Sequence, residues 1–212
     1  MQLKQLAQGL GGIIPGGISI LDFAIVAKID QISAKQILNV LVANSIGKFD
    51  GDLIQFTAGD KLKAALYAIT EGVPIEEVST HLNWKDFEGL VAEILESKGF
   101  RIIRNLILTK PRMEIDVIGE NHGVVLLIDC KHWKRQSSSS LNNSVKKQIG
   151  RVKHYVAKTQ GVVGVPAIVT LYQEQLSFID KVPIVPISQF SSFVDEFYGN
   201  LDSLNTIETS SK

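Results

Sequence analysis

The chain has 212 residues, of which 45% are hydrophobic and 21% charged, and its formal net charge is zero. This composition fits a globular protein of one large or two small domains, and it excludes attraction to nucleic acid through overall charge. The single cysteine, Cys130, cannot form an internal disulfide, which favours a reducing cytoplasm. The apolar run from Ile13 to Val26 is too short and interrupted to cross a bilayer, and no secretory signal is evident, so we expect a cytoplasmic protein outside the membrane.

The first third of the chain has the element order of a winged helix. Helices are expected over residues 1–10, 18–29, 34–44 and 60–70, with Ser33 as the N-cap of the third. The pair Asp50-Gly51 between two apolar runs predicts a β-hairpin whose two central residues have positive φ. Helix, turn, helix and hairpin together predict a small, mostly helical winged-helix domain over residues 1–72.

Two functions fit this predicted domain. In the first, the helix over residues 34–44 enters a DNA major groove with Lys35 and Gln36, and Lys48 in the hairpin contacts phosphate. In the second, the domain contacts protein or makes a dimer, because Lys35 is the only cation on that helix and phosphate neutralisation dominates DNA affinity.

A helix with one carboxylate beside its apolar stripe follows a short linker. Residues 73–83 are predicted to be a linker helix with Pro74 in its first turn. Asn83 is the expected N-cap of a helix over residues 84–98, which Gly99 ends. Glu88 lies at the margin of the buried stripe of this helix, from which a carboxylate can reach a neighbouring strand end.

The next segment is the centre of the predicted functional site. A strand over residues 100–108 precedes a hairpin that runs from Glu114 to Trp133. Its first strand carries Asp116 in an apolar run, and its second ends with Asp129 and Lys131, which share a face because side chains alternate along a strand. Two carboxylates beside an ammonium predict a site for a hard cation, and a salt-bridged strand cluster is the alternative.

The order Asp116 and then Asp129-Cys130-Lys131 resembles the PD-(D/E)xK nuclease superfamily, which has the restriction-endonuclease-like fold. The helix with Asp86-Phe87-Glu88 and the strand from Gly164 to Thr170 are similar to the Mrr-type branch, as is the layout of two domains. The resemblance covers residues 84–197, and Ile115 stands where the motif has proline. It implies an α/β domain over residues 84–199, with a mixed central sheet flanked by helices.

The resemblance also implies a function, which is hydrolysis of DNA phosphodiester bonds by a Mg²⁺-dependent endonuclease, with Mn²⁺ able to substitute. The implied metal ligands are Asp116, Asp129, the carbonyl of Cys130 and Glu88. Lys131 is expected to orient the attacking water and stabilise the anionic phosphate. Glu114, which shares a strand face with Asp116, and Gln148, on the helix after the lysine strand, are second-tier candidates.

A run of 28 residues, 131–158, contains no acidic side chain and supplies local positive charge that the net charge conceals. Its serine- and asparagine-rich part, residues 136–144, is predicted to be a mobile loop. We expect this run to contact the phosphate backbone of DNA, and an ordinary solvated surface is the alternative. The predicted DNA-contacting cations are Lys134, Arg135, Lys146, Lys147 and Arg151.

The C-terminal third predicts further alternation of helices and strands. Helices are expected over residues 144–157, 171–179 and 188–198, the last capped by Ser188. Strands are expected over residues 162–169 and 182–187, with Pro166 tolerated only near a strand start or at an edge. The prolines of the second strand predict that it is an edge of the sheet. Residues 200–212 are predicted to be a frayed polar tail.

The sequence leaves open whether the nuclease is a restriction enzyme or a structure-specific resolvase or repair nuclease. Two other classes of function also remain open. One is a nuclease fold that binds DNA or assembles with other proteins without cleaving. The other is a transcription regulator built on the winged helix. For the nuclease we expect duplex or branched DNA as the partner and a homodimer, because cutting both strands together takes two sites.

Overall fold

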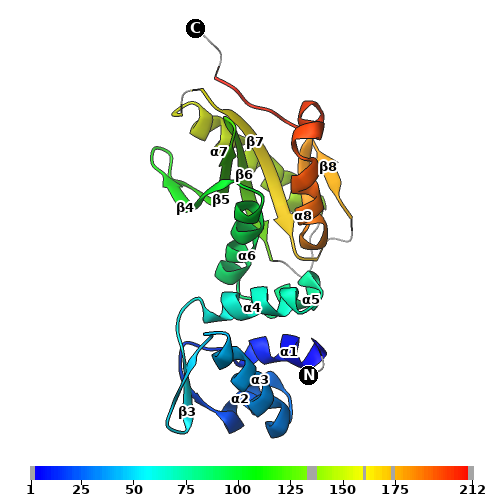
Figure 1. Cartoon of the computed structure of the whole chain (residues 1–212). Helices are drawn as coiled ribbons and strands as arrows, with labels where there is room; N and C mark the ends of the chain where they lie inside the picture. The colour runs from blue at the N-terminus through cyan, green and yellow to red at the C-terminus, as the bar shows by residue number, and fades with distance from the viewer. Residues whose placement is uncertain (1–2, 133–137, 160, 173–174, 210–212) are drawn as a thin grey trace. The chain divides into compact units, whose positions relative to one another are not determined.

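The structure is a computed structural model that describes residues 3–132, 138–159, 161–172 and 175–209. The chain divides into two compact units, residues 1–86 (unit 1) and 87–212 (unit 2), which Figure 1 draws with their elements labelled. The division falls within one helix, α6 (Trp84–Ser97), close to the predicted start of the nuclease domain. The boundaries 72/73 and 83/84 and the winged-helix assignment stay predictions.

Unit 1 combines helices with a small antiparallel sheet of order β1-β3-β2. Its elements are α1 (Leu3–Gly9), η1 (Leu10–Gly12), β1 (Gly16–Ser19), α2 (Ile20–Ala27), α3 (Gln31–Ala43), β2 (Lys48–Asp50), β3 (Leu53–Phe56), α4 (Asp60–Thr70) and α5 (Ile75–Ser79). Strand β1 was not predicted, and it takes up the first two residues of the helix expected over residues 18–29. A Cβ added to Gly17 would lie 2.8 Å from Gln55 Nε2 on β3, so close pairing rather than strand propensity specifies β1.

Two local predictions in unit 1 are wrong by a few residues. The N-cap of α3 is Asp30, whose Oδ1 accepts a hydrogen bond from the Ser33 backbone N at 2.8 Å, so Ser33 is the third residue of the helix. The hairpin loop consists of Gly51 and Asp52, and Gly51 alone of the two has positive φ, at 58°. That pattern, with glycine first, is typical of a type II′ turn.

Unit 2 is built on a six-stranded mixed sheet of order β4-β5-β6-β7-β9-β8. Its further elements are β4 (Arg101–Leu108), β5 (Met113–Asn121), β6 (Val124–Lys131), α7 (Ser138–Val156), β7 (Val163–Thr170), β8 (Ser177–Ile179), β9 (Val182–Pro186), α8 (Ile187–Glu196) and η2 (Tyr198–Ser203). Strands β6, β7 and β9 run parallel, and the other pairings are antiparallel. The predicted mixed sheet flanked by helices is confirmed.

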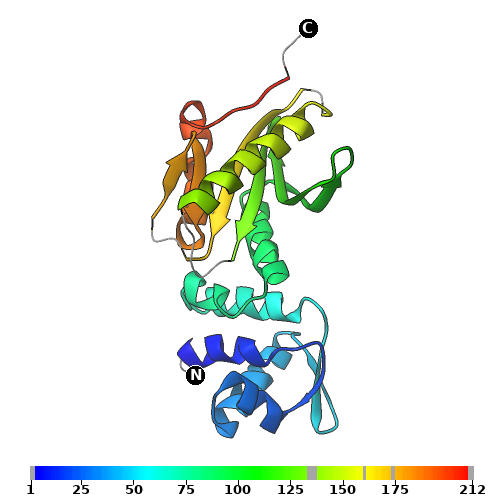
Figure 2. The same cartoon turned by 180° about the vertical axis from the view of Figure 1, so that it is seen from behind.

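Helices cover both faces of this sheet, with α6 and α8 on one face and α7 on the other, as the two opposite views show (Figure 1, Figure 2). Glycines let two of these helices approach closely. A Cβ on Gly119 of β5 would lie 3.0 Å from Leu95 of α6, and a Cβ on Gly164 of β7 would lie 2.5 Å from Val156 of α7. Each glycine therefore fixes how deeply a helix packs onto the sheet.

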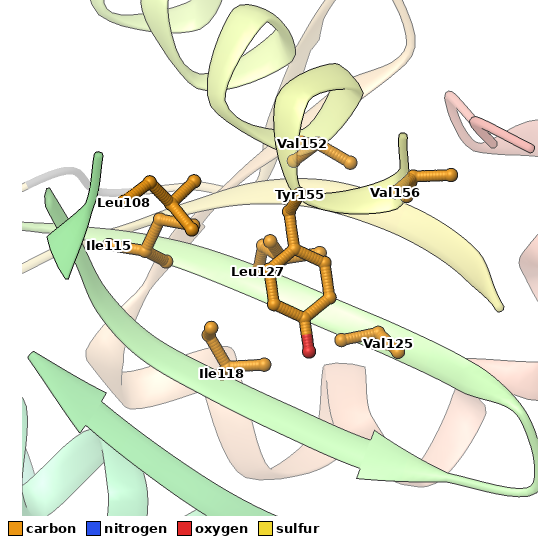
Figure 3. Close-up of a cluster of buried hydrophobic side chains, with 8 residues drawn as sticks. All are labelled: Leu108, Ile115, Ile118, Val125, Leu127, Val152, Tyr155 and Val156. Atoms are coloured by element: carbon orange, nitrogen blue, oxygen red, sulfur yellow. The ribbon is translucent and has the colours of Figure 1, made fainter. Parts of the chain in front are cut away.

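A cluster of buried side chains attaches α7 to β5 and β6 (Figure 3). Its members are Leu108, Ile115, Ile118, Val125, Leu127, Val152, Tyr155 and Val156. Full burial of one such aliphatic side chain contributes about 1.5–3 kcal/mol. The cluster therefore holds α7 firmly against the strands that carry the predicted site.

In the hairpin of β4 and β5, the regular alternation of side chains between the two faces of the sheet is interrupted at one residue pair. On β4, Ile103 and Leu106 both pack against this cluster, and on β5 both Ile115 and Ile118 belong to it, so in each strand the two residues are three positions apart. Strict alternation would place residues three apart on opposite faces. Between them lie Asn105, with a left-handed φ of 53°, and Asp116, which the flanking register places opposite each other. The hairpin therefore kinks where Asp116 leaves the regular strand pattern.

Four predictions for the C-terminal third are wrong. Residues 175–179 include strand β8 in place of the predicted helix, and strand β9 lies between β7 and β8, so it is not an edge. Helix α8 begins at Ile187, after Pro186, so Ser188 does not cap it. Helix α7 begins at Ser138, because Leu141 packs onto the core cluster of Val145 and Ile168, and this packing overrides weak helix propensity.

The segment after α8 is not a frayed tail over the described residues. Ile207 forms a two-bond bridge with Gly164 of β7, with N···O distances of 2.8 and 2.9 Å. Strand β7 pairs with β9 only from Ile168 onward, so Pro166 lies between that ladder and the bridge. This gap explains how a proline without an N–H group stands within an internal strand.

Candidate active site

The candidate site lies where β5 and β6 separate. Their backbone pairing ends at Val117 and Ile128. Beyond that point the Cys130 N–H donates a hydrogen bond to Asp116 Oδ2 at 2.7 Å, so a carboxylate replaces the backbone carbonyl that a continued ladder would offer. The kink at Asp116 and the separation of the strands together bring this carboxylate to the end of β6.

Asp129 is held by two cations at the same strand end. It is only 3% exposed, and its two oxygens contact different partners. Oδ2 lies 2.7 Å from Lys131 Nζ, and Oδ1 lies 2.8 Å from Arg151 Nη1 of α7. The ion pair with Lys131 confirms that these two residues share a strand face. A buried carboxylate with such partners is compensated in charge.

Gln148 connects α7 to this cluster and is fully buried. Its Nε2 donates to the Leu127 carbonyl at 2.8 Å, and its Oε1 accepts from Arg151 Nη1 at 3.1 Å. Arg151, predicted as a DNA contact, instead points inward to Gln148 and Asp129. Nη1 of its guanidinium thus has two acceptors in the site, and the side chain is 22% exposed.

Glu88 of α6 brings a third carboxylate to the same surroundings. It is 5% exposed, and its Oε2 has no hydrogen-bond partner among the described residues. Burial, and then repulsion from Asp116, raise the pKa of Glu88 to about 7. Burial, and then repulsion from Asp129, raise the pKa of Asp116 to about 6. These carboxyl groups disfavour one another's ionisation, and a bound cation would relieve that repulsion.

The donor set fits a hard divalent cation in chemistry, since carboxylate and carbonyl oxygens are the ligands that such ions prefer. The orphaned Glu88 Oε2 supports that fit. Over the described ranges, however, no three His, Cys, Asp or Glu side chains are gathered closely enough to hold an ion. Lys131 and Arg151 engage Asp129, and the Cys130 amide engages Asp116.

The remaining predicted ligands differ in placement. Burial raises the pKa of the Cys130 thiol well above its usual range, so this side chain is neutral, while its carbonyl remains the predicted donor. Glu114 is exposed on β5, yet its charge is among those that raise the pKa of Glu88. Glu114 is therefore an electrostatic neighbour of the cluster.

One residue of the site was not predicted from the sequence. Thr170 ends β7 and pairs in register with Lys131 of β6. It is 4% exposed, and its Oγ1 has no hydrogen-bond partner among the described residues. A threonine at a strand end gives no signal of its own, and only the parallel pairing of β6 with β7 brings it beside the lysine.

The predicted DNA-contacting cations fall into different places. Lys146 and Lys147 are exposed on α7, as phosphate contact requires. Lys134 and Arg135 lie outside the described residues. In unit 1, Lys35, Gln36 and Lys48 are exposed on α3 and β2. The same unit also exposes large apolar side chains. The most exposed are Ile32, Ile25 and Trp84, at 75%, 65% and 55%.

Among the described residues, no helix is both long and apolar enough to span a membrane. The sheet order, the flanking helices and the cluster of acidic residues and lysine at the strand ends define a restriction-endonuclease-like domain. Residues 79–167 match the Mrr catalytic family model, which is described as a restriction endonuclease. The chain belongs to this Mrr-type family.

Three known proteins are similar to parts of this chain. An uncharacterized protein of Archaeoglobus fulgidus is 30% identical over 121 residues, which cover 55% of this chain and 93% of that protein. The structure of AF1548, a protein of unknown function, is 25% identical over 44% of this chain, with a TM-score of 0.35. That of VC1899 from Vibrio cholerae is 11% identical over 95% of this chain, with a TM-score of 0.43. Each match covers 50% of the solved chain.

Proposed function

We propose that the protein is a metal-dependent endonuclease that hydrolyses phosphodiester bonds in DNA. The observation that carries this proposal is the meeting of Asp116, Asp129 and Lys131 where β5 separates from β6, in a chain of the Mrr-type family. Family membership supports nuclease activity, and the carboxylates beside a lysine supply the groups that such chemistry needs.

Mg²⁺ is the proposed cofactor, with Mn²⁺ as a substitute. Asp116, Asp129, Glu88 and the Cys130 carbonyl would hold it. When bound, the cation would supply a water of lowered pKa and neutralise charge on the phosphate. Binding needs Glu88 and Asp116 to be ionised, and their raised pKa values of about 7 and about 6 make that step depend on pH.

The chain's own residues divide the remaining work. Lys131 lies against Asp129, and its ammonium would orient the attacking water and stabilise negative charge as the phosphate reacts. Arg151 and Gln148 are positioning residues, because they reach the site through Asp129 and Leu127. Thr170 offers a buried hydroxyl beside Lys131 on the next strand, which would hydrogen-bond to a phosphate oxygen.

The proposed partners are DNA and a second copy of the chain. Exposed Lys146 and Lys147 on α7 would contact phosphates flanking the cleaved bond. Each chain has one candidate site, so cleavage of both strands together needs two chains related by a two-fold axis. We place this activity in the cytoplasm, where DNA is present and the thiol of Cys130 stays reduced.

Nicking of supercoiled plasmid with Mg²⁺ or Mn²⁺ tests the proposal. The natural chain is compared with Asp116→Asn and Lys131→Ala, and with Asp202→Asn as a control at an exposed carboxylate of the same unit. We expect both site variants to lose nearly all nicking and the control to keep it, with folding checked by circular dichroism. Equal nicking by all four proteins would reveal a contaminating nuclease and refute the proposed site.

A second function, DNA binding without cleavage, is favoured by one observation. Both oxygens of Asp129 already have cationic partners, which leaves little capacity for a metal ion. Isothermal titration with Mg²⁺ and Mn²⁺ separates the two functions. Saturable binding that Asp116→Asn removes supports the nuclease. An absence of metal binding at pH 8, together with no nicking, supports the non-cleaving function.

A further inference from the structure

Three aromatic rings form a row in unit 2. Phe87 of α6 meets His132, which follows β6, with ring centroids 5.4 Å apart and planes at 66°. His132 in turn meets Tyr172, which follows β7, with centroids 6.2 Å apart and planes at 69°. Both contacts are edge-to-face, an arrangement that aromatic pairs favour and that fixes ring orientation.

This aromatic row is next to the candidate site, both in sequence and through the pairing of β6 with β7. His132 directly follows Lys131, and Phe87 directly precedes Glu88. Tyr172 comes two residues after Thr170, which pairs in register with Lys131. Each ring is thus one or two residues from a member of the acidic and lysine cluster, at the carboxyl ends of β6 and β7.

Burial decreases along the row from the first ring to the last. Phe87 is fully buried, His132 is half-buried, and Tyr172 is 39% exposed. Packing of the hydrophobic core explains why Phe87 is buried. It does not explain why an exposed tyrosine, Tyr172, ends the row. The result is an outer ring that is accessible to a ligand and held in place by the two rings behind it, so little freedom remains to be lost on binding.

We propose that Tyr172, supported by His132, is a stacking platform for an unpaired nucleobase next to the cleaved phosphate. This inference rests on the proposed nuclease function and names its substrate class, which is single-stranded DNA or duplex DNA with locally unpaired bases. Every base has a π-face, so an exposed aromatic ring binds single strands with little dependence on sequence. In an intact duplex both faces of each base are already stacked on neighbours.

The platform complements the charges in the same place. The cations of α7 would hold the backbone of the strand, and Lys131 would act at the phosphate, while Tyr172 would hold a base. A groove of cations combined with stacking rings is the usual arrangement for binding single strands. Loss of one stacked base typically costs about 1–3 kcal/mol, or roughly 5- to 150-fold in affinity.

The test measures binding without divalent metal, so that no cleavage occurs. Fluorescence anisotropy is recorded for one oligonucleotide as a single strand and as its duplex, with the full chain, Tyr172→Ala and Tyr172→Phe. Phe178→Ala is the matched control, because this ring is 52% exposed on β8 of the same unit. We expect Tyr172→Ala to weaken single-strand binding about 5- to 150-fold and duplex binding less than about twofold. The other two variants should bind like the natural chain.

A second readout is specific to stacking. Fluorescence of 2-aminopurine in the single strand should be quenched by the natural chain and by Tyr172→Phe, and should stay unquenched with Tyr172→Ala. Equal losses on single strand and duplex, no loss on either, or no binding of single strands by the natural chain would each overturn the platform.

The outcome for the platform is separable from the outcome for the nuclease. Ring-dependent binding of single strands without any nicking in Mg²⁺ or Mn²⁺ would refute the proposed activity and leave the base-stacking site in place. Nicking that needs Asp116, with binding that ignores Tyr172, would keep the nuclease and overturn the platform. Faster cleavage of gapped than of intact duplex, reduced by Tyr172→Ala and restored by Tyr172→Phe, would support both.

Discussion

Arg151 contacts Asp129 through a 2.8 Å bond from Nη1 to Oδ1, and thereby brings a guanidinium from α7 to the buried carboxylate at the end of β6. The same guanidinium donates to Gln148, which is anchored on the Leu127 carbonyl. This relationship makes the orientation of Asp129 depend on a helix that the core cluster of Figure 3 fastens to the sheet.

We therefore expect Arg151→Met to act on stability and on Asp129. Removing one partner of a buried ion pair leaves charge uncompensated, and the remaining pair with Lys131 limits the loss to about 1–3 kcal/mol of unfolding free energy. Urea denaturation measures this. Lys147→Met, an exposed cation on the same helix, is the control and should stay within about 0.5 kcal/mol. Unchanged stability of Arg151→Met would refute the inward role and restore the prediction that this arginine contacts DNA.

Cationic side chains that contact phosphate should contribute to the salt dependence of DNA affinity. The double variant Lys146→Ala/Lys147→Ala is expected to reduce the slope of log affinity against log salt by up to about 1.8, since each lost phosphate contact removes about 0.9. Lys35→Ala in unit 1 provides the comparison. An unchanged slope in the double variant, with a reduced slope for Lys35→Ala, would assign DNA contact to α3 and exclude it for α7.

The raised pKa of Glu88 predicts how stability varies with pH. Its folded-state pKa of about 7 lies above its ordinary value of 4.5, so the neutral form is favoured by folding. That contribution is fully present below about pH 4.5 and is lost as pH rises through about 7. Glu88→Gln keeps a neutral group, so it should exceed the natural chain in stability by roughly 2–3 kcal/mol at pH 8 and match it at pH 4. Glu93→Gln, exposed on the same helix, should show no such difference.

The same carboxyl groups should make metal binding depend on pH in the opposite sense. Protons occupy Glu88 and Asp116 below their pKa values of about 7 and about 6, and a cation must displace them. We expect Mn²⁺ affinity to be at least about tenfold higher at pH 8 than at pH 5.5. Isothermal titration of the full chain measures it, and Glu88→Gln should flatten the dependence. Equal Mn²⁺ affinity at both pH values would show that Glu88 and Asp116 do not bind the ion.

Two glycines of unit 2 should respond oppositely to the same substitution. A Cβ at Gly150, inside α7, would meet nothing within 4 Å, so Gly150→Ala should stabilise the chain by about 0.5–1 kcal/mol. A Cβ at Gly164 would lie 2.5 Å from Val156 and 2.7 Å from Val152, so Gly164→Ala should destabilise it by about 1–3 kcal/mol. Thermal unfolding gives both values, and equal effects would contradict the close packing of α7 on β7.

The parts of the fold that follow local rules could be predicted from the sequence. Asn83 caps α6 through a 3.0 Å bond from the Asp86 N–H, and Gly99 ends that helix with a left-handed φ of 83°. The shared face of Asp129 and Lys131 followed from alternation along a strand. These features depend on residues that are only a few positions apart, so short sequence patterns are enough to predict them.

The parts that failed depend on partners distant in the chain. Strand β1 exists because β3 lies beside Gly17, and strand β9 is internal because residues 177–179 pair on its outer side. Arg151 was predicted to be an exposed DNA-contacting cation, because the neighbouring sequence gives no sign that it contacts Asp129, 22 residues away. Thr170 and Tyr172 join the site only through the parallel register of β6 and β7 and a ring contact.

The bridge between Ile207 and Gly164 has a consequence for how the chain behaves in concentrated solution. Before Ile168, β7 is an apolar strand that lacks β9 as its neighbour, and open strand edges recruit strands from other molecules. Ile207 occupies that edge at Gly164, and Pro166 withholds a hydrogen-bond donor where the edge would otherwise continue. The last described residues of the chain therefore protect the sheet against aggregation.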